Sequence, residues 1–321
     1  MRIPSVTVCL LVTVLMTMPA RALLFWNQDN SANTSDPLTG VPWGSVAAVS
    51  NGTGSLRSGS AVYLGNGYLL TANHVTMNAI YDFVTFNGVS FFQIDSTFQS
   101  GSRTAGKQVD TGLDMAVFKL QTIPGGIPAV TLLGTGTEEI APATIVGWGV
   151  GRDPADPLGD AVVTWGAEST TSAKRWGENV PLDLVNLSDG SYSYTAVRTV
   201  AGGSGPGYNP EGVGNNEAAV TLLDSGSGLF QNISGSWYLI GLTNTVSFQS
   251  GSFTTTFGND KTTGSTGDDN YFTQISAYDD KILALIPEPS AAQFVLFFAG
   301  ALLIFRARGS LGKLRILCAR S

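Results

Sequence analysis

The feature that most limits the folds open to this chain is a repeated pair of short, alternating apolar runs joined by Asn-Gly. In "SAVYLGNGYLLTA" the two runs meet at Asn66-Gly67, and in "FVTFNGVSFFQI" they meet at Asn87-Gly88. Alternation with a period of two indicates half-buried strands, and Asn-Gly favours the left-handed backbone that a tight hairpin requires. Further short apolar runs follow, so the sequence predicts an all-β protein: "MAVFKL", "ATIVGWGV", "AAVTLL" and "SWYLIGLTNTV".

One helical pattern stands near the end of this β-rich region. The stretch "QISAYDDKILALI", residues 274–286, places Ile275, Tyr278, Ile282 and Leu285 three or four residues apart. This spacing puts the four side chains on one face of a helix. The sequence therefore predicts a single C-terminal helix over residues 274–286.

The N-terminal end has the pattern of an export signal. Residues 1–22 have a basic start, an apolar middle and a small-residue close at Ala20-Arg21-Ala22, as in a cleaved signal peptide. A first transmembrane helix is the weaker interpretation, because the apolar run is short and no stop-transfer flank follows it. Residues 23–40 are expected to form a loose N-terminal arm.

The C-terminal end also carries a pattern of its own. The apolar run "AAQFVLFFAGALLIF", residues 291–305, precedes Arg306 and Arg308 and predicts a short transmembrane helix with a cytoplasmic basic end, in preference to a buried core helix. With Pro287-Glu288-Pro289 before it, this tail resembles the PEP-CTERM sorting signal of Gram-negative bacteria. The resemblance implies that residues 287–321 hold a precursor transiently at the inner membrane. An exosortase-type enzyme would then process it, leaving an extracellular or cell-surface product.

The composition of the body between these ends excludes several classes of protein. The two cysteines, Cys9 and Cys318, lie in the predicted signal and tail, so the body has no disulfide and no thiolate metal site. Its ten basic and 23 acidic residues give a net charge of −13, which repels nucleic acid. We expect no cofactor, no metal and no nucleic-acid partner. Residues 258–270 contain Asp and Asn but lack a regular calcium-loop spacing.

Catalytic chemistry is suggested by the only histidine of the 321 residues. His74 follows an apolar run in "YLLTANHV". Asp114 leads the apolar run "DMAVFKL", and a glycine-flanked serine, Ser225, stands in "LLDSGSGLF". Nucleophilic catalysis by serine needs a base to take its proton, and the base needs an acid to orient it. The three residues meet that requirement in the order His, Asp, Ser.

These segments resemble the motifs of chymotrypsin-like (trypsin-fold) serine proteases. The similarity involves "LLTANHV", "DMAVFKL" and "DSGSGLF", the Gly147-Trp148-Gly149 strand, "VPWGSVAAV" at 41–49 and "YFTQISAYDDKI" near the end. It covers residues 41–286 and implies two six-stranded antiparallel β-barrels with a C-terminal helix. The barrels would span about 41–135 and 140–275, with the catalytic cleft between them.

The resemblance also implies a role for each matching residue. Ser225 would be the nucleophile, His74 the general base and acid, and Asp114 the carboxylate that orients His74. The backbone N–H groups of Leu223 and Ser225 would form the oxyanion hole. Two rivals stay open, namely Ser227 as nucleophile and Asp110 as orienting acid.

Several positions depart from the family pattern. Leu223 stands where the family has glycine, the usual activation sequence is missing, and no obvious amine is available to pair with Asp224. Ala219 stands where trypsin-like members carry an acid, so a substrate pocket formed with Thr243 and Asn244 would offer no charge to a basic side chain.

The sequence therefore predicts a secreted serine endopeptidase that hydrolyses peptide bonds in a protein or peptide substrate through an acyl-enzyme. The alternative is a protease-like binding or surface protein of the cell envelope or biofilm matrix with weak or no catalysis. A structural β-protein of the cell surface would leave His74 unexplained.

Overall fold

The computed structural model describes the body of the chain in stretches, and the predicted ends lie mostly outside them. The described residues are 23–25, 31–52, 57–76, 81–100, 105–136, 138–151, 162–164, 173–188, 192–201, 213–221, 223–246, 256–258 and 268–287. The predicted signal (1–22), the membrane segment (291–305) and the rest of the tail beyond Pro287 fall outside this set. Within the described stretches, no helix combines the length and the apolar character needed to cross a bilayer.

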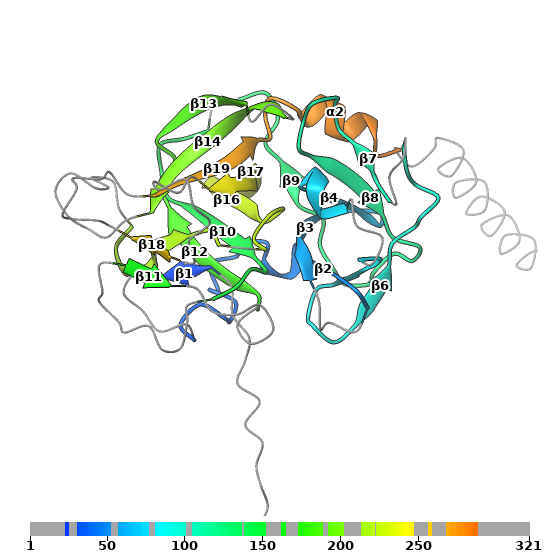
Figure 1. The fold of residues 1–321 in the computed structure, drawn as a ribbon, viewed down its shortest axis with the longest axis horizontal. Helices are drawn as coiled ribbons and strands as arrows, with labels where there is room; N and C mark the ends of the chain where they lie inside the picture. The colour runs from blue at the N-terminus through cyan, green and yellow to red at the C-terminus, as the bar shows by residue number, and fades with distance from the viewer. Residues whose placement is uncertain are drawn as a thin grey trace, which may run out of the picture. The chain divides into compact units, whose positions relative to one another are not determined.

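The first sheet has seven strands in the order β6-β5-β2-β3-β4-β8-β7, and all neighbours are antiparallel (Figure 1). Alternate side chains of its strands meet in one apolar core, which includes Ala47, Val49, Ala61 and Phe118. The strands are β2 (Val46–Ser50), β3 (Arg57–Gly65), β4 (Tyr68–Thr71), β5 (Phe83–Thr85), β6 (Phe91–Gln93), β7 (Lys107–Gln108) and β8 (Ala116–Lys119).

Both predicted hairpins are confirmed in this sheet. Strands β3 and β4 are joined at Asn66-Gly67, where φ is 52° and 83°, the left-handed values that a two-residue turn needs. Strands β5 and β6 are joined through Asn87-Gly88, and the Asn87 side-chain oxygen accepts hydrogen bonds from the N–H groups of Val89 and Ser90.

The second sheet has eight strands, seven of them in the order β12-β10-β16-β17-β19-β14-β13. The eighth, β9, pairs with β17 in parallel, and the other pairs are antiparallel. A second apolar core includes Ile145, Val197, Leu229 and Phe272. The strands are β9 (Thr131–Leu132), β10 (Ala143–Gly147), β12 (Arg175–Asn179), β13 (Asp183–Ser188), β14 (Ser193–Ala201), β16 (Gly228–Ile233), β17 (Ser236–Val246) and β19 (Asp268–Gln274).

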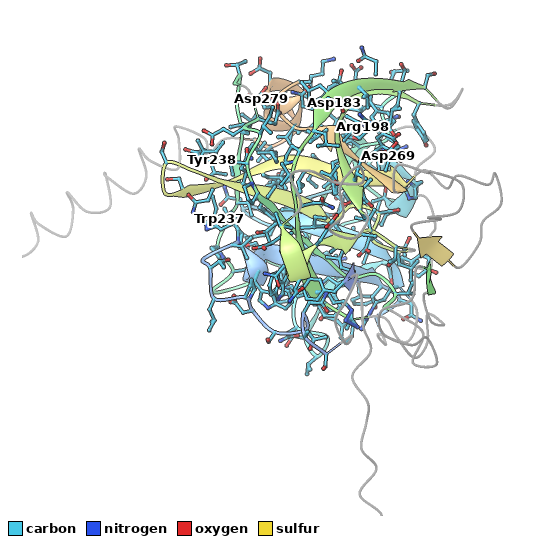
Figure 2. All side chains as sticks on the ribbon, turned by 90° about the vertical axis from the view of Figure 1, so that its left-hand side faces the viewer. Asp183, Arg198, Trp237, Tyr238, Asp269 and Asp279 are labelled. Carbon is cyan, nitrogen blue, oxygen red and sulfur yellow. The ribbon has the colours of Figure 1, made fainter. Side chains whose placement is uncertain are left out.

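A charged cluster crosses the outer strands of this sheet. Arg198 on β14 donates two hydrogen bonds of 2.8 Å to the carboxylate of Asp183 on β13. Its Nη1 lies 3.5 Å from Asp269 on β19. Figure 2 shows the three side chains on one side of the molecule. Because these charges are partly exposed, the cluster contributes little to the free energy of unfolding.

The prediction of an all-β protein with two antiparallel halves is confirmed, with seven and eight strands in place of six each. The two curled sheets in Figure 1 are the arrangement expected of the chymotrypsin-like double barrel. Two further strand pairs are small: β1 (Leu24–Phe25) with β15 (Ala218–Ala219), and β11 (Val162–Thr164) with β18 (Thr256–Gly258).

The prediction of a loose arm over residues 23–40 is wrong for Leu23, Phe25 and Asn33, which pack against the second sheet. Leu23 is fully buried in the core of that sheet, and Asn33 is 1% exposed. Leu24 and Phe25 of the apolar "LLF" form a strand whose backbone pairs with β15, and the side chains of Leu23 and Phe25 are buried.

The C-terminal helix is shorter than predicted. Helix α2 spans Asp279–Ala284, whereas Gln274 ends β19 and pairs with Gly241. The turn at Ile275–Tyr278 separates strand from helix, and its closing hydrogen bond runs from the Tyr278 N–H to the Ile275 carbonyl. Two acidic residues then open the helix, where they complement the positive end of its dipole.

We predict that Gly67→Ala destabilises the protein by about 1–2 kcal/mol, because an L side chain is strained at a φ of 83°. An added Cβ would meet only ordinary contacts, so the cost is conformational. Urea unfolding measures it. Gly125→Ala is the control, because its φ lies outside the left-handed region and its Cβ would meet nothing within 4 Å. An equal loss in both variants would contradict the turn geometry.

Candidate active site

His74 and Asp114 are brought together by the ends of two paired strands. His74 lies in the 3₁₀ turn η2 (Asn73–Thr76) just after β4, and Asp114 lies two residues before β8. Thr71 faces Ala116 where these strands pair, so the segments that carry the two residues run side by side. The His74 ring nitrogen Nδ1 is 2.7 Å from Asp114 Oδ2, and the His74 backbone N–H donates to Asp114 Oδ1 over 2.9 Å.

Burial makes the two members of this pair unequal. The Asp114 side chain is 3% exposed, whereas the His74 side chain is 43% exposed. A carboxylate can only accept, so Nδ1 carries the proton in the neutral ring and Nε2 keeps a lone pair. Nε2 of the half-exposed His74 ring is therefore available as a base. The buried Asp114 carboxylate fixes the ring from its other side, through Nδ1.

The rival acid Asp110 accepts hydrogen bonds from residues of its own turn. Its side-chain oxygen accepts from the Thr111 N–H, and its carbonyl accepts from the Leu113 N–H. The His74 ring is bound to Asp114. The geometry thus favours Asp114 as the partner of His74.

Ser225 is held against the first sheet by its own backbone. It lies in the turn before β16 and is half-buried, and its carbonyl accepts a 2.7 Å hydrogen bond from the Ser60 N–H on β3. A Cβ at Gly59 would lie 2.7 Å from both the Ser225 carbonyl oxygen and the Val75 side chain. Gly59 is therefore the point at which the serine turn and the histidine turn meet. Among the described residues, no hydrogen bond joins the Ser225 hydroxyl to His74.

Ser227, the rival nucleophile, is fully buried. Its hydroxyl donates to the hydroxyl of Ser60 over 3.1 Å. A Cβ at Gly147 would lie only 1.9 Å from the Ser227 hydroxyl oxygen. Ser227 therefore packs between the halves, and Ser225 is the serine of the two that a substrate could reach.

The backbone N–H groups around Ser225 divide into two sets. Those of Asp224, Gly226 and Ser227 donate to backbone carbonyls over 2.8–3.1 Å. In the described part of the chain, the N–H groups of Leu223 and Ser225 donate to nothing. They are thus the two donors of this turn that a carbonyl oxygen of a substrate could use.

Leu223 adopts a backbone conformation that is unfavourable for a residue with a side chain. Its φ is 69°, in the left-handed region, which costs a residue with a side chain about 1–2 kcal/mol. The surrounding hydrogen bonds hold this conformation in spite of the leucine side chain.

Asp224 is a fully buried carboxyl group next to the serine. Its Oδ2 accepts from the N–H and the hydroxyl of Thr221 over 2.8 and 3.0 Å. Burial raises the pKa of Asp224 to about 7, while the bonds from Thr221, the charge of Arg175 and the backbone of Gly149 act in the opposite direction. The carboxyl therefore changes charge near neutrality.

The Gly-Trp-Gly motif makes room for this carboxyl. A Cβ at Gly149 would lie 2.5–2.7 Å from the carbon and both oxygens of the Asp224 side-chain carboxyl, and one at Gly147 would lie 2.7 Å from Oδ1. Any side chain at either position would displace Asp224, and with it the serine turn.

Of the three residues predicted to line a substrate pocket, Thr243 contacts this turn directly. The N–H of Thr243 donates to the Ser227 carbonyl, and its carbonyl accepts from the Gly226 N–H, so β17 runs directly beside the turn. Asn244 donates to the Thr273 hydroxyl over 3.1 Å. Ala219 is 2% exposed in β15.

Sequence reasoning missed Ser60 and Tyr192. Ser60 is the polar member of the run "SAVYL", and a serine at an inward position of an apolar strand could have marked it. Tyr192 accepts a hydrogen bond from Asn73, next to His74, over 3.2 Å. It stands in a connection with no pattern that could reveal this contact.

No protein-family model and no curated protein matches this sequence. Among solved structures, the HtrA-type protease AlgW with a decapeptide aligns at 19% identity and a TM-score of 0.43, over 72% of this chain and 52% of its own. The chain thus spans about half the length of AlgW. The Rv3671c protease in its inactive form aligns at 11% identity and a TM-score of 0.47, over 82% of this chain and 99% of its own. An inactive mutant of Rv3671c from M. tuberculosis aligns at 12% identity and 0.47, over 79% and 94%. These similarities are remote, and the architecture rests on the two sheets themselves.

We predict that Asp224 makes the protein less stable as pH rises. Its folded pKa of about 7 lies above the ordinary value of 3.8, so its contribution is fully present below pH 3.8 and is lost as pH rises through 7. Between pH 5 and pH 8 this loss is about 2–3 kcal/mol at 1.36 kcal/mol per pKa unit. Urea unfolding of wild type and Asp224→Asn at both pH values measures it, and the variant should lack this decline.

Asp95→Asn is the control for that measurement. A hydrogen bond from the Thr97 hydroxyl lowers the pKa of Asp95, so its contribution is constant between pH 5 and pH 8. This variant should therefore keep the wild-type decline. An identical pH dependence in wild type and Asp224→Asn would contradict the assignment.

Proposed function

We propose that this protein is an exported serine endopeptidase that uses His74, Asp114 and Ser225. The observation that carries the proposal is the bound His74–Asp114 pair, together with the packing of Gly59 against both the Ser225 carbonyl and Val75, the residue after His74. A lone histidine bound to a buried carboxylate next to a glycine-flanked serine has the composition of a nucleophilic triad.

The reaction follows from these groups. The Ser225 hydroxyl oxygen attacks the carbonyl carbon of a peptide bond, and His74 Nε2 takes the hydroxyl proton. Asp114 stabilises the imidazolium, and the N–H groups of Leu223 and Ser225 bind the oxyanion. The leaving amine departs with the proton from His74. Water then repeats the steps on the ester and releases the acid and the free serine.

The relation between the Ser225 and His74 side chains bears on this proposal. Their side chains share no hydrogen bond in the described structure, and such bonds are often loose until substrate binds. The same observation, with the strained Leu223, motivates the alternative of a protease-like binding protein with weak or no catalysis. Labelling of the serine by an active-site probe separates the two.

We propose uncharged P1 residues, of small to medium apolar type, as the preferred substrates. Ala219, Thr243 and Asn244 give the proposed pocket no charge to bind a basic side chain. A peptide-library profile dominated by Arg or Lys at P1 would overturn this preference.

We also propose that the working protein has neither end. Residues 1–22 would be removed on export, and an exosortase-type enzyme would cut the tail near Pro287 after a transient stay at the inner membrane. The product would be extracellular or at the cell surface. Equal membrane retention of the full chain in hosts with and without an exosortase would argue for a permanent anchor.

We predict that Ser225→Ala abolishes labelling by a fluorophosphonate probe, while Ser227→Ala retains it. His74→Ala should lower turnover by roughly four to six orders of magnitude without unfolding the protein. Peptide mapping of the labelled protein identifies the modified serine. An adduct on Ser227, or more than a tenth of wild-type hydrolysis in His74→Ala, would refute the proposed triad.

A further inference from the structure

A buried guanidinium lies on the same side of the second sheet as the Asp224 carboxyl. Arg175 is fully buried at the start of β12, and it faces Gly147 directly across the β10–β12 pair. Opposed residues in an antiparallel pair point to the same face. The place that a Gly147 side chain would take is 2.7 Å from Asp224 Oδ1. Arg175 thus lies on the face of the sheet against which the Asp224 carboxyl packs, and the charge of its guanidinium lowers the pKa of Asp224.

Arg175 is held from the other side by Asn33. Its Nη1 donates to Asn33 Oδ1 over 3.0 Å. The side-chain nitrogen of Asn33 donates to the carbonyls of Leu23 and Trp176 over 3.1 and 2.9 Å, and the Asn33 carbonyl accepts from the Trp176 N–H. With the Asn33 amide bound on both sides, Arg175 receives a fixed acceptor.

The segment around Asn33 is built into the region that leads to the serine. Leu24 and Phe25 pair with Ala219 and Ala218, a few residues before Asp224. The Phe25 ring packs edge-on against Trp176, with centroids 5.5 Å apart. Residues 24–25 therefore pair with the strand before the serine turn, and Phe25 and Asn33 both contact Trp176 on the strand that carries Arg175.

We propose that Arg175, held by Asn33, is the internal counter-charge of Asp224 and thereby positions the turn that carries Ser225. This inference rests on the proposed function for its catalytic meaning. Asp224 is adjacent to Ser225, so a shift of its carboxyl moves the N–H groups of Leu223 and Ser225. Arg175 and Asn33 do not touch the proposed reacting atoms, and they act as positioning residues.

The physical reason is the cost of an unbalanced buried charge. Removing one of two opposite buried charges that act on each other leaves the other uncompensated, whereas removing both is far less costly. The proposal therefore requires that loss of Arg175 lower the labelling rate and the stability only while Asp224 can ionise.

The test is a double-mutant cycle at pH 8 with Arg175→Met, Asp224→Asn and both together. We expect Arg175→Met to lower the rate of fluorophosphonate labelling and kcat by about 10- to 100-fold, with KM changed less than threefold. Adding Arg175→Met to Asp224→Asn should cost less than threefold more. Independent, multiplicative effects would overturn the proposal.

Two further variants separate charge from packing. Arg175→Lys keeps the charge and should restore at least a third of the wild-type labelling rate, a rescue that a purely structural role would not produce. Asn33→Ala should lower labelling about 3- to 30-fold. Asn87→Ala removes an exposed turn asparagine from the first sheet and should leave the labelling rate unchanged. No rescue by lysine, or equal losses in the two asparagine variants, would count against the proposal.

The same cycle, measured as the unfolding equilibrium constant in urea, needs no activity. We expect Arg175→Met to raise that unfolding constant at least tenfold more when Asp224 is present than in the Asp224→Asn variant.

If wild type does not label but this coupling is found, the proposed function fails and the counter-charge stands. If Arg175→Met does not fold, rescue by Asp224→Asn supports the proposal, and a double variant that stays unfolded refutes it. Absence of coupling in a folded set overturns it.

Discussion

The arrangement of the two halves depends on the hydrogen bonds of one buried residue, Ser60. Its N–H donates to the Ser225 carbonyl, its hydroxyl accepts from the Trp148 N–H and the Ser227 hydroxyl, and its carbonyl accepts from the Thr71 hydroxyl. Buried polar groups must be satisfied, and here the partners come from both sheets. A shift of either sheet would leave several of these groups unpaired at once.

The candidate site follows from this join. The strand ends of the first sheet supply His74 and Asp114, and the turn before β16 supplies Ser225. Contacts beyond the site strengthen the same arrangement, because Ser193 at the start of β14 and Tyr192 before it bind the segments that carry Asp114 and His74. The Ser193 N–H donates to the Gly112 carbonyl, and Tyr192 accepts from Asn73. His74 is thus placed by its direct bonds to Asp114, whereas the Ser225 turn is placed against the first sheet by the backbone bond between Ser225 and Ser60.

The parts of this molecule that could be predicted from sequence are those that follow a local rule. Asn66-Gly67 between alternating runs defines a hairpin because few other residues tolerate its backbone. The length of the helix was mispredicted because a three- to four-residue spacing beginning at Ile275 cannot show that Gln274 is already paired in a sheet. The strand at Leu24–Phe25 is not predicted, because three apolar residues are too few for a period to be seen. Arg175 and Asn33 meet across 142 residues of sequence, and no local pattern reports such a contact.

The pairing of β1 with β15 also has a consequence for the order of folding. Leu24 and Ala219 are separated by 195 positions, whereas the hairpins of the first sheet close over a few residues. Closing a longer loop costs more chain entropy, and contacts between distant segments slow folding. The hairpins of the first sheet can therefore form before β15, the strand that precedes the serine turn, pairs with β1. The groups around Ser225 would then be ordered late, after most of the protein has reached its final shape.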